Sequence, residues 1–402
     1  MKISRRSATT TASPLRSLVE RNDESIHVHR LNIGQPDIKP PKEFFDGLKK
    51  HTKTNGSVPY EAAAGNKQLI HQWTKLLNSQ YKTNITPDEM IITAGSSEAL
   101  TFVFSVCCDV NDEILVFSPS YANYAGFAAI SGVTLVPIEM DESESFRAGT
   151  DTYRIIKHIT DRTRAMLICS PNNPTGTVFT QAEIRHLLDI AETHDLYLIV
   201  DEVYREFVYD NIQPRCIFQD SRKNGRVIVV DSVSKRYSLC GARVGCIISP
   251  NKDIITSVLN CASTRVSTAT LEQKAVAHML EHMTASYLKN AVEEYRGRRD
   301  VLIQELAKIE GVEYTVPDGG FYVLVKLPID DARLFAQFML RDFSVNGVTV
   351  SIAPASAFFI NSTISTSYVR IAFVAPKPAL MMAVNILAKA LDAYRLSIQP
   401  MI

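Results

Sequence analysis

The residues of this chain with the clearest chemical potential follow a short apolar stretch near its middle. Residues 226–230 are mostly apolar and β-branched, which predicts a buried strand, and Lys235 follows where that strand should end. Ligands of open α/β sheets bind at the carboxyl ends of the strands. A lysine in a desolvated pocket there loses its proton more easily and becomes an amine nucleophile that can form a Schiff base. On its own, Lys235 is more simply a solvated loop lysine, as most lysines are.

The spacing around Lys235 separates these two interpretations. Ser232 and Ser234 precede the lysine, and Arg243 follows it between two glycines. A planar guanidinium suits a phosphate, and glycines let the backbone approach closely. The order Ser-x-Ser-Lys and then Gly-x-Arg-x-Gly resembles the lysine segment of fold-type I pyridoxal phosphate (PLP) aminotransferases of class I/II. The resemblance implies that Lys235 holds PLP as a Schiff base and that Ser232, Ser234 and Arg243 bind the cofactor.

The bulk composition fits a globular protein with no nucleic-acid or membrane partner. The 402 residues include 43 basic and 43 acidic side chains, and no apolar run approaches the ~18 residues of a membrane span. Seven cysteines without a CxxC pair favour reduced thiols and a cytoplasmic location. The histidine spacings predict no metal site. Residues 1–17 are rich in Ser, Thr and Arg, as transit peptides are, but we expect a flexible arm that packs on a partner subunit.

Two segments near the N-terminus match loops of the resembled family. Residues 31–37 form an apolar start broken by turn residues, which predicts a loop near a strand end. In the family this loop approaches the substrate carboxylate through its glycine, which is Gly34 here. Tyr60 matches a tyrosine that reaches the phosphate of the neighbouring subunit, although by itself it would be read as a packing residue. The resemblance thus implies a homodimer with shared active sites.

A small-residue turn opens the helix expected after the strand at residues 89–93. Gly95, Ser96 and Ser97 form this turn, and the free backbone NH groups at a helix start attract anions. A serine at a helix start is also simply an N-cap. Placed before Lys235 and Arg243, the turn is expected to hold the cofactor phosphate. Tyr121, after a further apolar strand, matches the family's aromatic ring that stacks on the pyridine.

The most specific motif of the chain is Asn-Pro-Thr-Gly at residues 173–176. Asn173 follows an apolar strand, and in the family this asparagine donates to the phenolic oxygen of PLP and contacts the substrate. Asp201 ends the continuous apolar run 196–200, which is typical of a strand buried on both faces. A buried aspartate is costly unless it is paired, and a pyridinium nitrogen supplies such a pair. A simpler role for Asp201 is that of an N-cap for the segment that follows. In the family, Tyr204 would lie beside the phenolic oxygen of PLP.

Two arginines are the expected substrate contacts. Arg370 lies inside an apolar strand, which favours a partnered guanidinium, and the family uses this position to grip the substrate α-carboxylate. Some relatives read a distal carboxylate with a lysine where this chain has Ser97. Arg265, in the loop-like segment 261–267, is our candidate for that task across the dimer, although a structural interface role is equally compatible. The usual proline-glycine turn is replaced at residues 354–359, so the path of that loop is left open.

The alternation of strands and helices between residues 90 and 250 predicts an α/β fold with a mostly parallel sheet. The resemblance covers residues 31–373 and implies the fold-type I PLP transferase architecture. We expect an N-terminal arm and first part of a small domain at residues 1–45. A large PLP domain should follow at 46–296, and a small α+β C-terminal domain at 297–402.

The expected activity is transfer of an amino group from an L-amino acid, with aspartate favoured, to a 2-oxo acid such as 2-oxoglutarate. Lys235, Asp201 and Tyr204 are the expected catalytic residues. Two alternatives on the same fold stay open. One is an aminotransferase for aromatic or small apolar amino acids, and the other is a PLP-dependent lyase or synthase. A PLP-fold transcriptional regulator is disfavoured because the chain shows neither an added DNA-binding domain nor a basic surplus.

Overall fold

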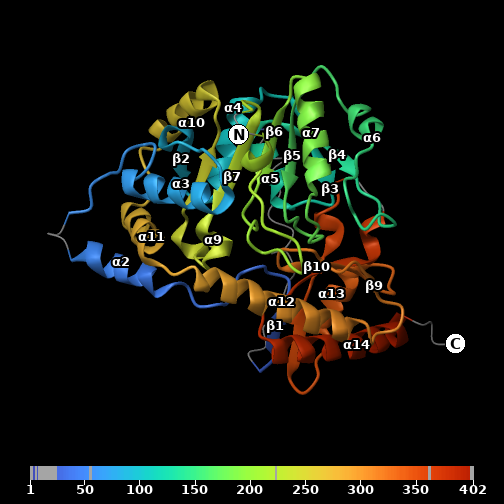
Figure 1. Ribbon diagram of the computed structural model, residues 1–402. Helices are drawn as coiled ribbons and strands as arrows, with labels where there is room; N and C mark the ends of the chain where they lie inside the picture. Colours follow the sequence, from blue (N-terminus) through green and yellow to red (C-terminus); the bar gives the residue numbers. More distant parts are fainter. Residues whose placement is uncertain are drawn as a thin grey trace.

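The computed structural model describes residues 3–4, 7, 25–53, 57–221, 224–360 and 364–398. Most of the predicted N-terminal arm therefore lies outside the described residues. The centre of the molecule is a seven-stranded sheet (Figure 1). Its order is β2 (Met90–Thr93), β8 (Gly245–Ile248), β7 (Val227–Ser232), β6 (Tyr197–Asp201), β5 (Thr163–Cys169), β3 (Glu113–Ser118) and β4 (Thr134–Glu139). Only β8 runs against the others, so the predicted α/β fold with a mostly parallel sheet is confirmed.

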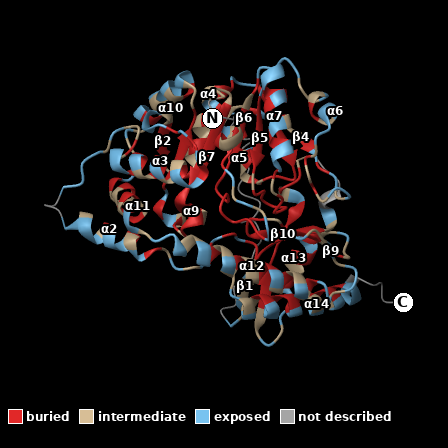
Figure 2. Ribbon diagram, viewed as in Figure 1, coloured by how far each residue is buried: buried red, intermediate tan, exposed pale blue. Residues whose placement is uncertain are grey.

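The sheet is covered by helices on both faces, which is why its strands read as continuous apolar runs. Alternate residues of each strand enter different cores: Ile199 and Ile228 pack in one, Val200 and Val229 in the other. The first core includes α4 (Ser96–Cys107), α5 (Asn123–Ser131) and α10 (Lys252–Thr264). The second includes α2 (Lys42–Thr52), α3 (Lys67–Tyr81), α7 (Gln181–Thr193) and α11 (Thr270–His282). Figure 2 shows the strands as the buried centre of this body.

A smaller body lies below the sheet in Figure 1. It contains an antiparallel sheet in the order β12 (Ala353–Pro354), β13 (Tyr368–Ala372), β10 (Tyr322–Lys326) and β9 (Glu313–Tyr314). The strand β1 (His27–Arg30) pairs in parallel with β11 (Val348–Ser351), so a segment from the first part of the chain joins the C-terminal part here. Its helices are α12 (Ser286–Leu306), α13 (Ala332–Arg341) and α14 (Lys377–Ile398). The predicted domain boundary at residue 296 falls inside α12, and the division of the chain stays a prediction.

The short helices are α6 (Thr152–Ile156), α8 (Phe218–Ser221) and α9 (Val233–Arg236). Local sequence explains several helix starts: at α7, Thr180 and Glu183 form a reciprocal capping box. None of the helices within the described ranges is both long and apolar enough to cross a bilayer.

One local expectation was wrong. Residues 261–264 were expected to be loop-like but form the last turn of α10, and Arg265 is its C-cap. A second stretch, 293–299, is rich in charge, a pattern that is typical of a solvated helix surface. It lies in α12, but Arg298 and Arg299 are buried there because acids from distant segments pair with them, Asp37 at 2.6 Å and Asp210 at 2.7 Å. Charge along a sequence does not reveal such long-range partners.

Candidate active site

A cavity of ≈ 650 Å³ opens at the carboxyl ends of the parallel strands, where the smaller body meets the sheet. Segments far apart in the chain meet in its wall because strands β5, β6 and β7 end side by side. Ten of the residues singled out in the sequence line this cavity: Gly34, Ser96, Ser97, Tyr121, Asn173, Asp201, Tyr204, Lys235, Arg243 and Arg370.

Lys235 reaches the cavity from α9, which begins directly after β7. Ser232 caps that helix by accepting a hydrogen bond from the Ser234 amide. The Lys235 Nζ donates to the carbonyl oxygen of Gly34 at 2.8 Å. A Cβ at position 34 would overlap the hydroxyl of Tyr322, so only glycine lets this loop approach the lysine.

Asp201 lies at the end of β6 and is 4% exposed. Its carboxylate accepts hydrogen bonds from the Tyr124 hydroxyl at 2.9 Å and from the Val203 amide at 3.3 Å. Within the described part of the chain, no lysine or arginine forms an ion pair with it. Burial raises the pKa of Asp201 to about 6, against the opposing effect of the Tyr124 hydrogen bond. A carboxylate in this state gains most from a cationic hydrogen-bond donor.

Arg370 is buried at 2% exposure inside β13 and is aimed at the cavity. Its Nη1 donates to the Asn173 Oδ1 at 2.9 Å, and its Nη2 donates to the Asn32 carbonyl at 2.6 Å. The guanidinium stacks between Tyr322 and Phe358, with Cζ 4.3 and 4.6 Å from the two ring centres. Nε has no hydrogen-bond partner among the described residues. Arg370 is thus a fixed cation with spare donor capacity, which suits a carboxylate.

The loop at residues 354–359, whose path the sequence left open, forms part of this arrangement. Pro354 ends β12, and a single 3₁₀ turn over Ala355–Ala357 follows. The Phe358 carbonyl then accepts from the Ser120 amide. This turn places the Phe358 ring 4.6 Å from the Arg370 Cζ, so the loop helps to hold the guanidinium group.

Two tyrosines occupy the wall between Asn173 and Lys235. The Tyr204 and Tyr322 hydroxyls lie 2.9 Å apart, and both side chains are buried. Tyr121 presents its ring to the cavity and packs edge-on against Tyr124 with a 5.4 Å centroid separation. Tyr124 and Tyr322 were not singled out in the sequence. Tyr124 lies in the first turn of α5, directly after the segment of Tyr121, and the local sequence contains no signal for it.

One end of the cavity carries groups that attract an anion. Gly95 is the N-cap of α4 with φ of 78°, a conformation that favours glycine. Ser96 and Ser97 follow in the first turn, where the NH groups of the helix point outward. The guanidinium of Arg243 lies against this turn: a Cβ at Gly95 would be 2.5 Å from its Nη2.

Five predicted site residues are not part of the cavity lining: Gly95, which is the N-cap of α4, and Ser232, Ser234, Tyr60 and Arg265. Ser232 and Ser234 are buried, with their hydroxyls 2.8 Å from each other. Tyr60 is 83% exposed, so its predicted contact depends on a second subunit. Arg265 is held within its own chain: its Nε pairs with Glu98 at 3.0 Å, and its Nη2 donates to the Ile92 carbonyl at 2.7 Å.

The cavity fits pyridoxal phosphate. The anion-attracting turn at Gly95 suits the phosphate, and the buried, cation-free Asp201 suits a protonated ring nitrogen. Lys235 provides the amine for a covalent bond to the aldehyde. Tyr121 offers a flat ring for stacking.

The comparisons with known proteins agree with the fold and this cavity. Residues 26–385 match the aminotransferase class I and II family, so the chain belongs to that family. It is a PLP-dependent aminotransferase that acts on amino acids and 2-oxo acids.

Three relatives illustrate how similar this chain is to individual members of the family. The chain is 29% identical over 356 residues to the aspartate aminotransferase of Sulfolobus acidocaldarius, covering 88% of this chain and 87% of the relative. The structure of aspartate aminotransferase from Thermotoga maritima superposes with a TM-score of 0.86 and 27% identity, covering 97% of this chain and 100% of that one. An aromatic aminotransferase structure from Pyrococcus horikoshii gives a TM-score of 0.83 and 27% identity, covering 92% and 97%.

Proposed function

We propose that this chain transfers the amino group of L-aspartate to a 2-oxo acid such as 2-oxoglutarate, with Lys235, Asp201 and Tyr204 as its catalytic residues. The observation that carries the assignment of residues is the buried Asp201, which has no cationic partner in the described chain and shares one cavity with Lys235 and Arg370. The choice of aspartate is supported by relatives such as the aspartate aminotransferases of S. acidocaldarius and T. maritima.

The proposed mechanism assigns one task to each residue. Bound PLP supplies an electron sink for the charge that develops at the substrate Cα. Arg370 grips the substrate α-carboxylate, and Asn173 fixes the orientation of that guanidinium. The Lys235 Nζ takes the proton from the substrate Cα as general base. Asp201 keeps the proton on the ring nitrogen, while Tyr204, with Tyr322 beside it, donates to the phenolic oxygen.

The distal carboxylate of aspartate needs a cation of its own. The charged residues in the described cavity wall are Asp201, Lys235, Arg243 and Arg370, and each already has a task. A homodimer would supply the missing cation, and we propose Arg265 of a second subunit, with Tyr60 reaching across in the same way. The ion pair of Arg265 with Glu98 would then have to be shared or exchanged. We also propose a cytoplasmic location, supported by seven free cysteines.

The lack of an unassigned cation also favours the second candidate, an aminotransferase for aromatic or small apolar donors. A panel of twenty amino acids with 2-oxoglutarate decides between the candidates. Stoichiometric formation of a new 2-oxo acid and glutamate is expected, with aspartate the best donor. A preference for apolar donors would overturn the aspartate assignment, and release of ammonia without glutamate would indicate a lyase.

The assignment of Lys235 is tested by Lys235→Ala. We expect this variant to bind PLP at the phosphate end of the cavity but to lose turnover by at least about 10⁴-fold, the upper range for a general acid–base group. Lys252, a lysine at the start of α10 outside the cavity, provides the matched control Lys252→Ala. Borohydride reduction of the wild type and peptide mapping should place the pyridoxyl group on Lys235. A label on another lysine would refute the assignment.

The proposed role of Arg265 across the dimer allows a sharper experiment. Arg265→Ala should lower kcat/KM for aspartate by about 2–5 kcal/mol while barely changing that for phenylalanine. Arg333→Ala, which removes an exposed arginine of α13, is the control. Mixed dimers of Lys235→Ala and Arg265→Ala subunits should regain aspartate activity, because one site then combines Lys235 with Arg265 of the other subunit. No recovery would mean that Arg265 acts within its own subunit.

A further inference from the structure

A second cavity, of ≈ 310 Å³, lies behind the active site. Cys169 and Asp201, at the ends of β5 and β6, line the active-site cavity, whereas the next residues, Ser170 and Glu202, line the second one. Successive residues of an extended chain point to opposite faces, so these strand ends separate the two cavities. The second cavity is therefore distinct from the site already described.

The interior of this cavity is apolar. Its walls come from β6, α7, the segment before α7 and the segment before α8, and their side chains include Val178, Phe179, Ile184, Val208, Ile212 and Ile217. An enclosed apolar wall of this kind favours an apolar group of a small ligand.

The mouth of the cavity carries both signs of charge. Arg147 pairs with Asp318 at 2.5 Å, and Arg215 pairs with Asp220 at 2.9 Å. The two guanidinium groups are 40% and 41% exposed, so they keep donors free for a ligand. Asp318 is 24% exposed and also remains accessible. A cation and an anion side by side match a zwitterionic head group.

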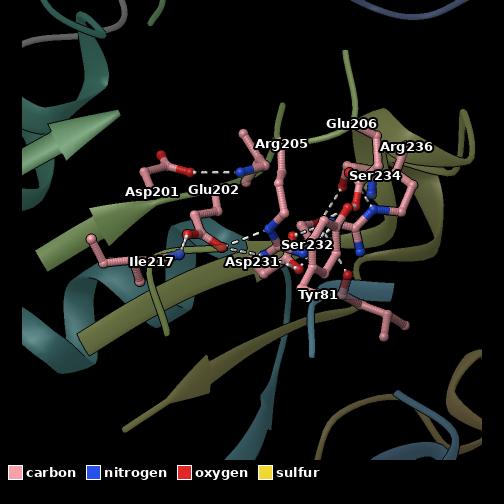
Figure 3. A network of polar contacts seen from close by, with 12 residues as sticks. Tyr81, Asp201, Glu202, Arg205, Glu206, Ile217, Asp231, Ser232, Ser234 and Arg236 are labelled. Atoms are coloured by element: carbon pink, nitrogen blue, oxygen red, sulfur yellow. Dashed lines mark hydrogen bonds and ion pairs between the residues drawn. The ribbon is translucent and has the colours of Figure 1, made fainter. Parts of the chain in front are cut away.

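The floor of the cavity is a buried polar network (Figure 3), in which the Arg205 Nη1 has no hydrogen-bond partner among the described residues. Glu202 accepts hydrogen bonds from the Ile217 amide at 2.7 Å and from Arg205 Nε at 2.6 Å. Arg205 also pairs with Asp231 at 3.0 Å. Because Glu202 already has its partners, it does not call for a charged ligand group, and the polar head belongs at the mouth.

We propose that this second cavity binds an α-amino acid with an apolar side chain. The side chain fills the apolar interior, the carboxylate pairs with Arg147 or Arg215, and the ammonium group pairs with Asp318. The bound amino acid is not a substrate there, since Lys235 opens into the other cavity.

The test uses α-methyl-L-phenylalanine, which has no Cα proton and cannot be transaminated, in calorimetric titrations of the PLP-loaded enzyme. The protein carries Arg370→Ala to remove the substrate α-carboxylate contact. We expect one binding event per chain that persists in this variant. Adding Ile212→Trp, which fills the cavity, should weaken binding by about tenfold or more. Leu334→Trp, which adds the same ring at an exposed position of α13, should leave it unchanged.

Ligand analogues test the zwitterion. 3-Phenylpropionate lacks the ammonium group and phenethylamine lacks the carboxylate, and each should bind at least about tenfold more weakly. Arg147→Ala combined with Arg215→Ala should lower the affinity without filling the cavity, which covers the case in which Ile212→Trp fails to fold. Absence of binding at millimolar ligand, equal binding of either analogue, or unchanged affinity in the cavity variants would overturn the proposal.

Discussion

Two aspartates lie at the ends of neighbouring strands of the sheet, and they differ in the partners of their buried carboxylates. Asp201 ends β6, and Asp231 lies near the end of β7; they are 4% and 0% exposed. Asp231 pairs with Arg205 and Arg236, each at 3.0 Å. Among the described residues, the Asp201 carboxylate has only the Tyr124 hydroxyl and the Val203 backbone amide as hydrogen-bond donors. A buried carboxylate is costly unless a cation or a hydrogen-bond donor compensates its charge. Asp231 has its cationic partners within the chain and is a structural residue. Asp201 would gain its cationic partner from a ligand.

The alternation of strand side chains produces this contrast. Val200 and Val229 pack in the core under α7, and Ile199 and Val230 pack in the core under α4. Continuing the alternation by one residue directs Asp231 towards the core under α7 and Asp201 towards the core under α4. Arg236 directly follows Lys235, so its ion pair with Asp231 also holds α9 against the sheet. The paired aspartate thereby fixes the element that carries the lysine.

The largest effect is expected from removing the unpaired carboxylate. Asp201→Ala should slow abstraction of the Cα proton far more than it weakens PLP binding. Loss of a buried charged partner costs about 3–5 kcal/mol, or roughly two to four decades in rate when it is felt in the transition state. Single-turnover rates and PLP dissociation constants measure the two quantities. A rate within threefold of the wild type would make Asp201 a structural residue like Asp231.

The paired carboxylate should instead show its effect in stability. Asp231→Ala removes the partner of two buried guanidinium groups and should lower the free energy of unfolding by about 3 kcal/mol or more. Urea denaturation measures it. Glu293→Ala breaks the exposed pair with Arg296 on α12 and should cost less than about 1 kcal/mol. Equal losses for the two variants would remove the distinction on which the comparison rests.

The sequence predicted the fold and the four charged residues of the cavity wall because their signals are local. An apolar strand followed by a polar residue identified Lys235, Asn173 and Asp201, and the topology of parallel strands then brings their ends together. Arg370 was recognisable as a charge inside an apolar strand. Asn173, Asp201 and Arg370 are buried, Lys235 is partly buried, and the structure has all four in one cavity.

The remaining features depend on partners that are distant in sequence. Asp231 and Asp201 both follow apolar, β-branched runs, so nothing local shows that one meets two arginines and the other meets none. Arg265 was expected in a loop, but a helix continues to Thr264, and its partner Glu98 lies far away in the chain. The role of Tyr124 appears only when α5 packs over the end of β6.

A smaller and opposite effect is expected in the protein without PLP. Because the folded pKa of Asp201 is about 6, above its ordinary 3.8, the folded state increasingly carries a costly buried charge as the pH rises through this interval. Asp201→Asn removes that charge, so at about pH 7.5 it should stabilise the cofactor-free protein by on the order of 2–3 kcal/mol. The gain should shrink by about 1 kcal/mol at pH 5. Urea unfolding at both pH values measures it, and a loss of stability at both would contradict the account.

The smallest effect is expected from Tyr124→Phe, which removes the hydroxyl that donates to Asp201 at 2.9 Å. A hydrogen bond to a charged group contributes about 1.5–3 kcal/mol, and it favours the ionised carboxylate. Without it the pKa of Asp201 should rise, so the acid limb of the kcat profile should move up by about one pH unit. Activity on the alkaline side should stay close to that of the wild type.

A control and a distinct outcome make this test decisive. Tyr287→Phe removes a hydroxyl that donates to the Lys39 carbonyl and should leave the pH profile in place. If Tyr124 only fills space, Tyr124→Phe should also leave the profile in place, because the ring is kept. A uniform loss at all pH values would point to altered packing rather than to the charge of Asp201. A displaced acid limb therefore identifies Tyr124 as the residue that orients the Asp201 carboxylate and favours its ionised form.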